Sequence, residues 1–254
     1  MSLGRPYYRI VRPSVPVIYY VHDNRYAQDM LQLRRSYFML EEKLNEILNY
    51  IEPDERNLNV FSMELYSLLL RACTEVELNC KLILKANDYN TNHNYSMRDY
   101  KKIERSSYLS KYVVKMNNWK KNDNGTVVYS SREFIPFGSF RESVYKSPEW
   151  YIAYNSVKHN REEYMHVATL KNCIHAVAGV LVLLYSQFGA SIIHQSSRFY
   201  LVDGRWDIIP ESSSIFYVIQ PKVSDFNQDE LYEFNWEVLQ KENTPFDKFC
   251  FNDI

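Results

Sequence analysis

The fold and the candidate site can both be predicted from one stretch, Pro148-Glu149-Trp150-Tyr151-Ile152-Ala153-Tyr154-Asn155-Ser156-Val157-Lys158-His159-Asn160-Arg161. Its apolar residues recur at the three- and four-residue spacing of an amphipathic helix, which places Trp150, Ala153 and Val157 on a buried face. Proline suits the first helical position, because its missing N–H would have no partner there. We therefore expect a helix over residues 148–162.

Polar side chains gather on the other side of this predicted helix. Asn155 and His159 stand one turn apart on one face, and Tyr154, Lys158 and Arg161 form a stripe beside it. A neutral imidazole can act as a general base, and nearby cations can hold a phosphate or stabilise its developing charge. These groups are the ones needed for metal-independent RNA cleavage by attack of a 2′-hydroxyl. The same residues can equally form a buried polar network that joins two helices.

Composition describes an ordinary soluble globular protein. The chain has 254 residues, of which 46% are hydrophobic and 24% charged, and its net charge is −1. This length suffices for one large domain, or for one domain with sizeable additions. A balanced charge argues against bulk electrostatic binding of nucleic acid, but it permits a local basic patch such as one that contains Lys158 and Arg161.

The four cysteines predict buried free thiols rather than disulfides or a metal site. Cys73, Cys80, Cys173 and Cys250 include no C-x-x-C pair, and the histidines are not spaced as metal ligands. The first 20 residues contain three prolines and do not resemble a signal peptide. The apolar run at 174–185 is shorter than the roughly 20 residues that cross a bilayer. We expect a cytoplasmic protein with no bound metal or cofactor and no membrane partner.

Helical periodicity extends well beyond the central stretch. We expect a mainly α bundle whose helices cover 26–51, 60–86, 97–105, 148–162 and 168–188. Asp23 or Asn24 would cap the first helix and Ser96 the third. The last helix is apolar nearly all round, so it should be buried on several sides, with His175 as a hydrogen-bonded core residue. Within 60–86, Arg71 and Glu75 either form a surface pair or face the polar stripe of helix 148–162.

Strand-like segments surround the predicted helices. Asn124-Gly125 lies between two β-favouring runs and predicts a hairpin, which forms an insert near 108–138. The N-terminal 24 residues should form an extended arm or edge strands, because prolines interrupt them. Residues 198–202 and 215–219 predict a small C-terminal sheet, with a turn at Asp203-Gly204. We divide the chain into an N-terminal arm and helix (1–59), a bundle with the insert (60–188) and a C-terminal β extension (189–254).

Most familiar catalytic motifs are absent from the sequence. It contains no P-loop, no G-x-G-x-x-G, no H-E-x-x-H and no G-x-S-x-G. What it does contain resembles the HEPN superfamily. The resemblance rests on residues 71–77 of one long helix, on Trp150 followed by Tyr154-Asn155-x-Val157-Lys158-His159-x-Arg161, and on the apolar helix after Ala168-Thr169-Leu170. It covers roughly residues 60–188, and it is greatest to prokaryotic HEPN-like proteins that carry this signature.

The resemblance implies a fold and an activity. HEPN domains are small helical bundles that usually dimerise, and many are metal-independent ribonucleases of toxin–antitoxin, abortive-infection and CRISPR-linked defence systems. Their site is an arginine followed, four to six residues later, by a histidine, commonly as R-N-x-x-x-H. Asn155 and His159 match the last two positions, whereas Tyr154 occupies the position of the arginine. Arg161, or Arg71 from the neighbouring helix, would have to supply the missing charge.

The sequence leaves three functions open. In the first, a homodimer cleaves RNA with His159 as general base or acid. Lys158 and Arg161 would contact the phosphate, and Asn155 would be the orienting residue. Tyr154 would stack on the substrate or donate a hydrogen bond. In the second, the module is catalytically degenerate and serves dimerisation or the binding of a nucleotide or RNA. In the third, the chain is a structural subunit of a larger assembly, which predicts a large exposed apolar face.

Overall fold

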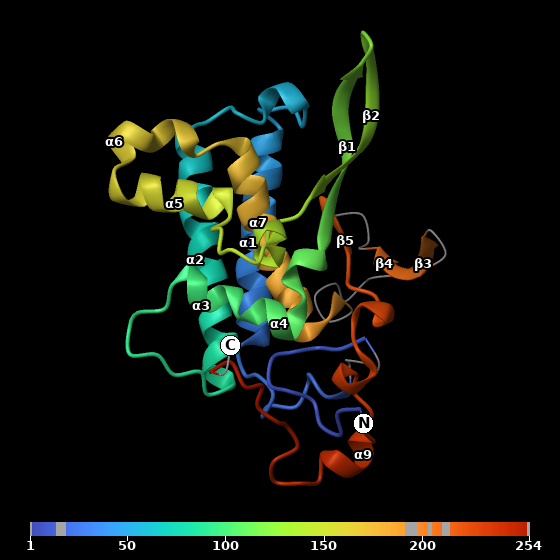
Figure 1. Cartoon of the computed structure of the whole chain (residues 1–254). Coiled ribbons are helices and arrows are strands. Elements are labelled where there is room, and N and C mark those ends of the chain that lie inside the picture. Colours follow the sequence, from blue (N-terminus) through green and yellow to red (C-terminus); the bar gives the residue numbers. More distant parts are fainter. Residues whose placement is uncertain (1, 14–18, 191–197, 203–204, 210–213, 253–254) are drawn as a thin grey trace.

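Three long helices form the body of the molecule. The computed structural model describes residues 2–13, 19–190, 198–202, 205–209 and 214–252. Within them α1 (Met30–Leu48), α2 (Met63–Ala86) and α7 (Leu170–Phe188) pack against one another, and the shorter α5 (Glu149–His159) packs on α7 and α2 (Figure 1). The fold is mainly α with a small antiparallel sheet, as the periodicity predicts.

The first helix is shorter than expected, while the second begins close to its predicted start. Neither Asp23 nor Asn24 caps α1; its N-cap is Asp29. Tyr26 is instead buried and donates a hydrogen bond of 2.5 Å to the carbonyl of Gln187, so the chain there packs against the end of α7. Ser62 caps α2 by accepting a hydrogen bond of 3.2 Å from the amide of Leu65.

The predicted helix 97–105 is two short helices. α3 (Met97–Lys101) and α4 (Ile103–Ser107) are separated at Lys102, and Tyr108 ends α4 in the left-handed conformation. Ser96 caps α3 as expected, in a capping box with Asp99.

Asp99 gives the protein a titratable contribution to stability. Its carboxyl is buried, and burial alone would raise its pKa. Hydrogen bonds from Tyr89 at 2.6 Å and from Ser96, together with a contact to His93, outweigh burial and lower the pKa to about 2. A depressed carboxyl pKa stabilises the fold above the ordinary value of 3.8, and this contribution is lost as pH falls from about 4 to 2.

We therefore expect the free energy of unfolding to fall by about 2 kcal/mol more in the wild type than in Asp99→Asn between pH 4 and pH 2. Urea unfolding at several pH values measures this difference. The control is Asp229→Asn, which removes an exposed carboxyl and should keep the wild-type pH dependence. Parallel pH profiles for the wild type and Asp99→Asn would contradict the prediction.

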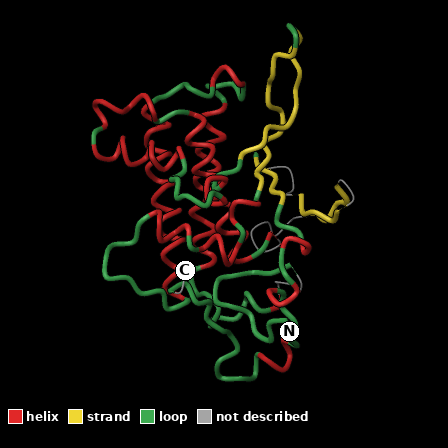
Figure 2. The backbone as a smooth tube through the Cα atoms, viewed as in Figure 1, coloured by secondary structure: helices red, strands yellow, loops and turns green. Residues whose placement is uncertain are grey.

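The β-hairpin insert forms as predicted and projects away from the helices. β1 (Val113–Asp123) and β2 (Thr126–Phe134) pair antiparallel, and their far end extends beyond the bundle (Figure 2). Asn124 and Gly125 in the turn both have positive φ, at 49° and 86°, which is the conformation that the Asn-Gly pair favours.

The C-terminal strands do not form the single sheet that we expected. β5 (Phe216–Ile219) pairs with β1, so the hairpin and β5 make one three-stranded sheet in the order β2-β1-β5. β3 (Arg198–Val202) pairs separately with β4 (Arg205–Ile209), and the predicted turn at 203–204 lies outside the described residues. Phe216 and Val218 are buried, so β5 contributes to the core at the base of the hairpin.

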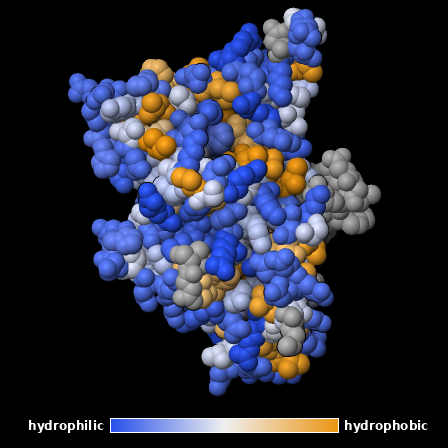
Figure 3. All heavy atoms as spheres, in the orientation of Figure 1, coloured by the Kyte–Doolittle hydropathy of each residue, from blue (hydrophilic) through white to orange (hydrophobic). Residues whose placement is uncertain are grey.

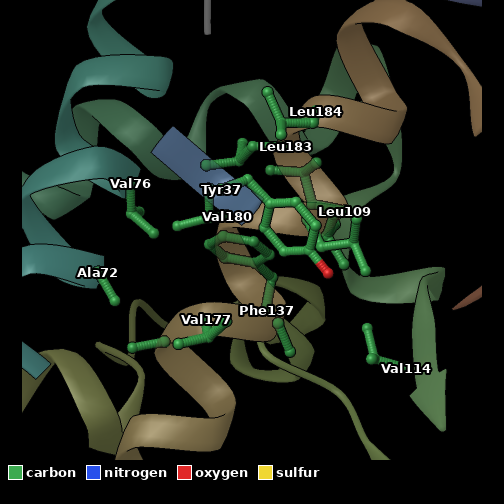
Figure 4. Close-up of a cluster of buried hydrophobic side chains, with 14 of the residues drawn as sticks. Tyr37, Ala72, Val76, Leu109, Val114, Phe137, Val177, Val180, Leu183 and Leu184 are labelled. Atoms are coloured by element: carbon green, nitrogen blue, oxygen red, sulfur yellow. The ribbon is translucent and has the colours of Figure 1, made fainter. Parts of the chain in front are cut away.

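α7 is the central helix of the core. Figure 4 shows Val177, Val180 and Leu183 of α7 among side chains from α1, α2, β1 and the loop after β2. By length and composition alone α7 would suffice to span a bilayer, but 83% of its most apolar window is buried inside the protein. The helix is therefore accounted for as the core of a bundle, as its apolar surface on all sides predicts.

Gly179 lies where α7 meets the loop after β2. A β-carbon built there would be 3.5 Å from Phe137 and 3.6 Å from both Pro136 and Val76, which are ordinary contact distances. Gly179→Ala should therefore raise the free energy of unfolding by about 0.5–1 kcal/mol, since alanine is the better helix former. Gly179→Leu should lower it by about 1–3 kcal/mol through overpacking. Urea unfolding of both variants tests this, and equal effects of the two substitutions would contradict it.

The ends of the chain pack together below the bundle. The amide of Leu3 donates to the carbonyl of Leu231, and the amide of Tyr8 to that of Asp247, so the N-terminal arm runs beside the C-terminal segment. The arm was predicted to be extended or to form edge strands, but its described residues form turns and two isolated bridges, at Leu3 and Tyr7. Part of its second β-favouring run lies outside the described residues. α9 (Trp236–Leu239) lies in this C-terminal segment, where Phe246 and Phe251 are buried. The three predicted segments thus share one continuous core.

Candidate functional site

The helix that carries the candidate site is anchored by its aromatic residues. Trp150, Ala153 and Val157 of α5 are buried, as the spacing predicts. The indole N–H of Trp150 donates a hydrogen bond of 2.8 Å to the carbonyl of Pro136, and its ring meets Phe137 edge-on. Pro148 is the N-cap residue rather than the first helical residue. The position of α5 is therefore fixed by the loop after β2 as well as by α7.

α5 ends earlier than expected. Its last residue is His159, and Asn160 adopts an extended conformation with φ −146° and ψ 82°. The Asn160 side chain then caps the short α6 (Arg161–Tyr164) by accepting a hydrogen bond of 3.3 Å from the amide of Glu163. Arg161 consequently begins a second helix instead of continuing the stripe of Tyr154 and Lys158. A corner between α5 and α6 results (Figure 1).

Tyr154 is a buried support for Lys158. It is 3% exposed, so its ring has no open face on which a base could stack. The Lys158 ammonium donates a hydrogen bond of 3.0 Å to the Tyr154 hydroxyl and lies 4.9 Å from the centre of the ring. This hydrogen bond raises the pKa of Lys158. Tyr154 therefore holds a cation at the surface, although it carries no charge itself.

His159 and Arg161 are exposed at the corner. Among the described residues, the His159 side chain has no hydrogen-bond partner. The Arg161 guanidinium lies 5.8 Å from the ring centre of Tyr66 on α2. Lys158 and His159 also stand in the last turn of α5, where positive charge is favoured by the helix dipole. We call Lys158, His159 and Arg161 the basic corner.

Acidic residues adjoin the basic corner. Glu162 and Glu163 are exposed on α6, and the Asn160 amide donates a hydrogen bond of 2.9 Å to Glu163. The local charge is therefore mixed, and the corner presents cations at specific positions rather than a broad positive field.

Asn155 lies on the same side of α5 as His159, one turn earlier. It is half-buried and lines a hollow of about 510 Å³ between α3 and α5, together with Arg98 and Tyr145. Residues four apart on a helix have β-carbons about 5–6 Å from each other. The structure therefore brings Asn155, Lys158 and His159 together on one side of α5.

Arg71 is not among these residues. It is exposed on α2 and lines a shallow hollow formed by α2 alone, next to Glu75. Two α2 side chains that do reach α5 and the corner are Tyr66 and Glu77; Glu77 accepts a hydrogen bond of 2.9 Å from the Tyr151 hydroxyl. Arg71 follows Tyr66 by five residues, so it points to a different side of the helix. Arg161 is consequently the arginine at the corner.

Sequence reasoning missed a larger hollow at the other end of α5. Its volume is about 710 Å³, and it lies between the loop at 135–148 and the first turns of α7. His175 is half-buried in its wall rather than in the core, and Lys171 forms an ion pair of 2.7 Å with Glu149 across it. Three polar positions at 171, 172 and 175, just before the apolar run at 176–184, were the available signal.

Within the described residues, no cluster of three or more histidine, cysteine or acidic side chains has the arrangement of a metal site. Of the four cysteines, Cys73, Cys80 and Cys173 are buried free thiols as predicted, whereas Cys250 is exposed.

Comparison of the chain with models of protein families, with curated proteins and with solved structures finds no match. The HEPN resemblance therefore rests on the residues of the sequence itself. The face of the molecule in Figure 3 is mainly hydrophilic, and its hydrophobic residues lie in small separate patches. This face does not have the large apolar area that a structural subunit would present.

Proposed function

We propose that this chain is a HEPN-like protein that binds RNA, with the basic corner as its phosphate contact. The observation that supports this most is the state of Lys158, His159 and Arg161: all three are exposed, and Lys158 is held in place by the buried Tyr154. Lysine and arginine contacts to phosphates supply most of the affinity of proteins for nucleic acid. The mixed local charge favours a few defined phosphate contacts over non-specific coating.

Metal-independent cleavage of the bound RNA is the second candidate activity. Its support is the exposed imidazole of His159, which has no partner among the described residues and stands between two cations. His159 would take the proton of a 2′-hydroxyl, and the 2′-oxygen would attack the adjacent phosphorus. The bond from phosphorus to the 5′-oxygen would break, and that oxygen would take a proton from an acid. The products are a 2′,3′-cyclic phosphate and a 5′-hydroxyl end.

The acid in this reaction has a natural source if the protein is a homodimer. Among the described residues, the basic corner of one chain has one histidine next to its two cations. A second copy that places its own His159 beside the same phosphate would provide the acid. The resemblance to HEPN proteins implies both the dimer and a place in bacterial defence or a toxin–antitoxin pair, and we propose them on that ground.

Binding to labelled RNA tests the proposed function. Lys158→Ala and Arg161→Ala should each weaken binding about tenfold, since a charge-assisted hydrogen bond contributes about 1.5 kcal/mol. Lys85→Ala is the matched control: Lys85 is exposed in the last turn of α2, 19 residues from Tyr66, and its loss should leave affinity unchanged. Equal affinity of all three variants and the wild type would reject the basic corner as the contact.

A further inference from the structure

Two hollows border α5 and have lining residues in common. The first lies at the start of the helix beside His175, and the second lies between α5 and α3 beside Asn155. Tyr145 and Ser147 line both of them, so the two hollows share a wall. We call the pair the α5 groove. Asn155, which lines the second hollow, stands one turn before His159 of the basic corner.

The first hollow presents hydrogen-bonding groups against an apolar wall. Nδ1 of His175 lies 2.9 Å from the carbonyl of Lys171, to which it donates, so Nε2 is left as an acceptor. Burial lowers the pKa of His175, which keeps the ring neutral. The buried hydroxyl of Ser139 has no partner among the described residues, and Ile135 and Pro136 supply apolar surface. A flat molecule with polar edges, such as a nucleobase, matches these requirements.

The second hollow contains a stacked aromatic residue. The guanidinium of Arg98 lies 4.3 Å from the ring centre of Tyr145, and Tyr145 is half-buried. Tyrosine rings and arginine guanidinium planes are the groups on which proteins stack unpaired bases of RNA. Asn155, on the same hollow, offers an amide to a base edge or to a phosphate oxygen.

The groove and the basic corner are spaced to contact one strand. α5 has 11 residues, so its two ends are about 15 Å apart. Successive nucleotides of a stacked strand rise by about 3.4 Å along its axis, so the length of the helix corresponds to a few nucleotides. Arg98 and Lys146 are exposed along the groove, while the charge of Glu149 is paired with Lys171.

We propose that the α5 groove binds a single-stranded segment of RNA, with one base in the hollow beside His175 and a neighbouring base stacked on Tyr145. The phosphates of the strand then continue to the basic corner. The inference rests on the proposed RNA binding, and it adds the form of RNA that is recognised and the place where base preference arises. Duplex RNA would bind less well, because its bases are not available to either hollow.

The first test measures the affinity for single-stranded and duplex RNA. Tyr145→Ala should weaken binding of a single strand about tenfold, which is within the range found when a stacking residue is lost, and should change duplex binding by less than twofold. Tyr129→Ala is the matched control, because Tyr129 is exposed on the projecting hairpin, and both affinities should stay as in the wild type.

The second test measures base preference. His175→Gln should change the order in which four homopolymer RNA oligonucleotides bind, because it replaces the acceptor that faces the base. A purely structural role of His175 would lower all four affinities together. If His175→Gln does not fold, Ser139→Ala supplies the same measurement with a smaller change in volume.

The outcomes separate this inference from the proposed function. A wild-type protein that binds no RNA overturns both. Binding that weakens in Lys158→Ala and Arg161→Ala but keeps its affinity and base preference in the groove variants overturns the groove alone. Binding that depends on Tyr145 and His175 but not on Lys158 and Arg161 supports the groove and rejects the basic corner.

Discussion

Replacement of Trp150 by alanine is expected to lower the free energy of unfolding by about 4 kcal/mol. Trp150 is 2% exposed, its ring packs against Phe137, and its N–H is bonded to the carbonyl of Pro136. Alanine removes the packing and also leaves that carbonyl without its donor. Small proteins are stable by about 5–15 kcal/mol, so the loss is a large share of the total.

Chemical unfolding followed by circular dichroism measures this loss. Trp150→Phe is the control, because it keeps an aromatic ring while it removes the hydrogen bond; it should cost about half as much as alanine. Ile152→Ala provides a second comparison, since Ile152 is an exposed residue of the same helix and its replacement should cost less than about 0.5 kcal/mol. If Trp150→Ala and Ile152→Ala had equal effects, α5 would not be anchored as described.

His159→Ala is expected to lower the rate of RNA cleavage at least 100-fold, if the second candidate activity is present in the wild type. General-base catalysis contributes about 10²–10⁴ to a rate. The residue is exposed at the end of α5, so the variant should unfold at the same denaturant concentration as the wild type. Single-turnover cleavage in excess chelator, with detection of the 2′,3′-cyclic phosphate, provides the measurement.

A second exposed histidine offers the matched control for this variant. His166 follows α6 and contacts the carbonyl of Glu163 at 3.2 Å, outside the basic corner. His166→Ala should therefore cleave at the wild-type rate. An unchanged rate in a folded His159→Ala protein would remove the catalytic role, and RNA binding by the basic corner would be the function that remains.

Helices could be predicted from the sequence where apolar residues recur regularly, whereas the residue at which a helix ends could not be predicted where the chain is polar. Trp150, Ala153 and Val157 gave the position and the buried face of α5. From Lys158 onward the chain is polar at every position up to Glu163, so the spacing of apolar residues does not indicate where the helix ends. The end is set by Asn160, whose side chain caps the next helix.

Strand pairing was the second limit of sequence reasoning. The hairpin was predictable because Asn124 and Gly125 have a local turn preference. The strand at 216–219 was also predictable from its composition, but its partner, β1, lies about 100 residues earlier. Such a pairing depends on how the helices bring distant segments together, and a single sequence does not record it.

Only part of the candidate site could be predicted from residue types. The exposure of Lys158 and His159 follows from the amphipathic pattern. Tyr154 was placed with the polar stripe, yet its ring is buried and only its hydroxyl reaches Lys158. His175 was predicted to lie in the core because its neighbours are apolar. It borders a hollow instead, since the loop at 135–148 does not close over the first turns of α7.

The dependence of RNA affinity on salt tests the central claim most directly. Each phosphate contact of a single strand contributes about 0.7 to the slope of the logarithm of affinity against the logarithm of salt concentration. We predict that Lys158→Ala/Arg161→Ala lowers the slope by about 1.4 relative to the wild type, and that Lys85→Ala does not change it. An identical slope in the wild type and the double variant would show that the basic corner does not contact phosphate.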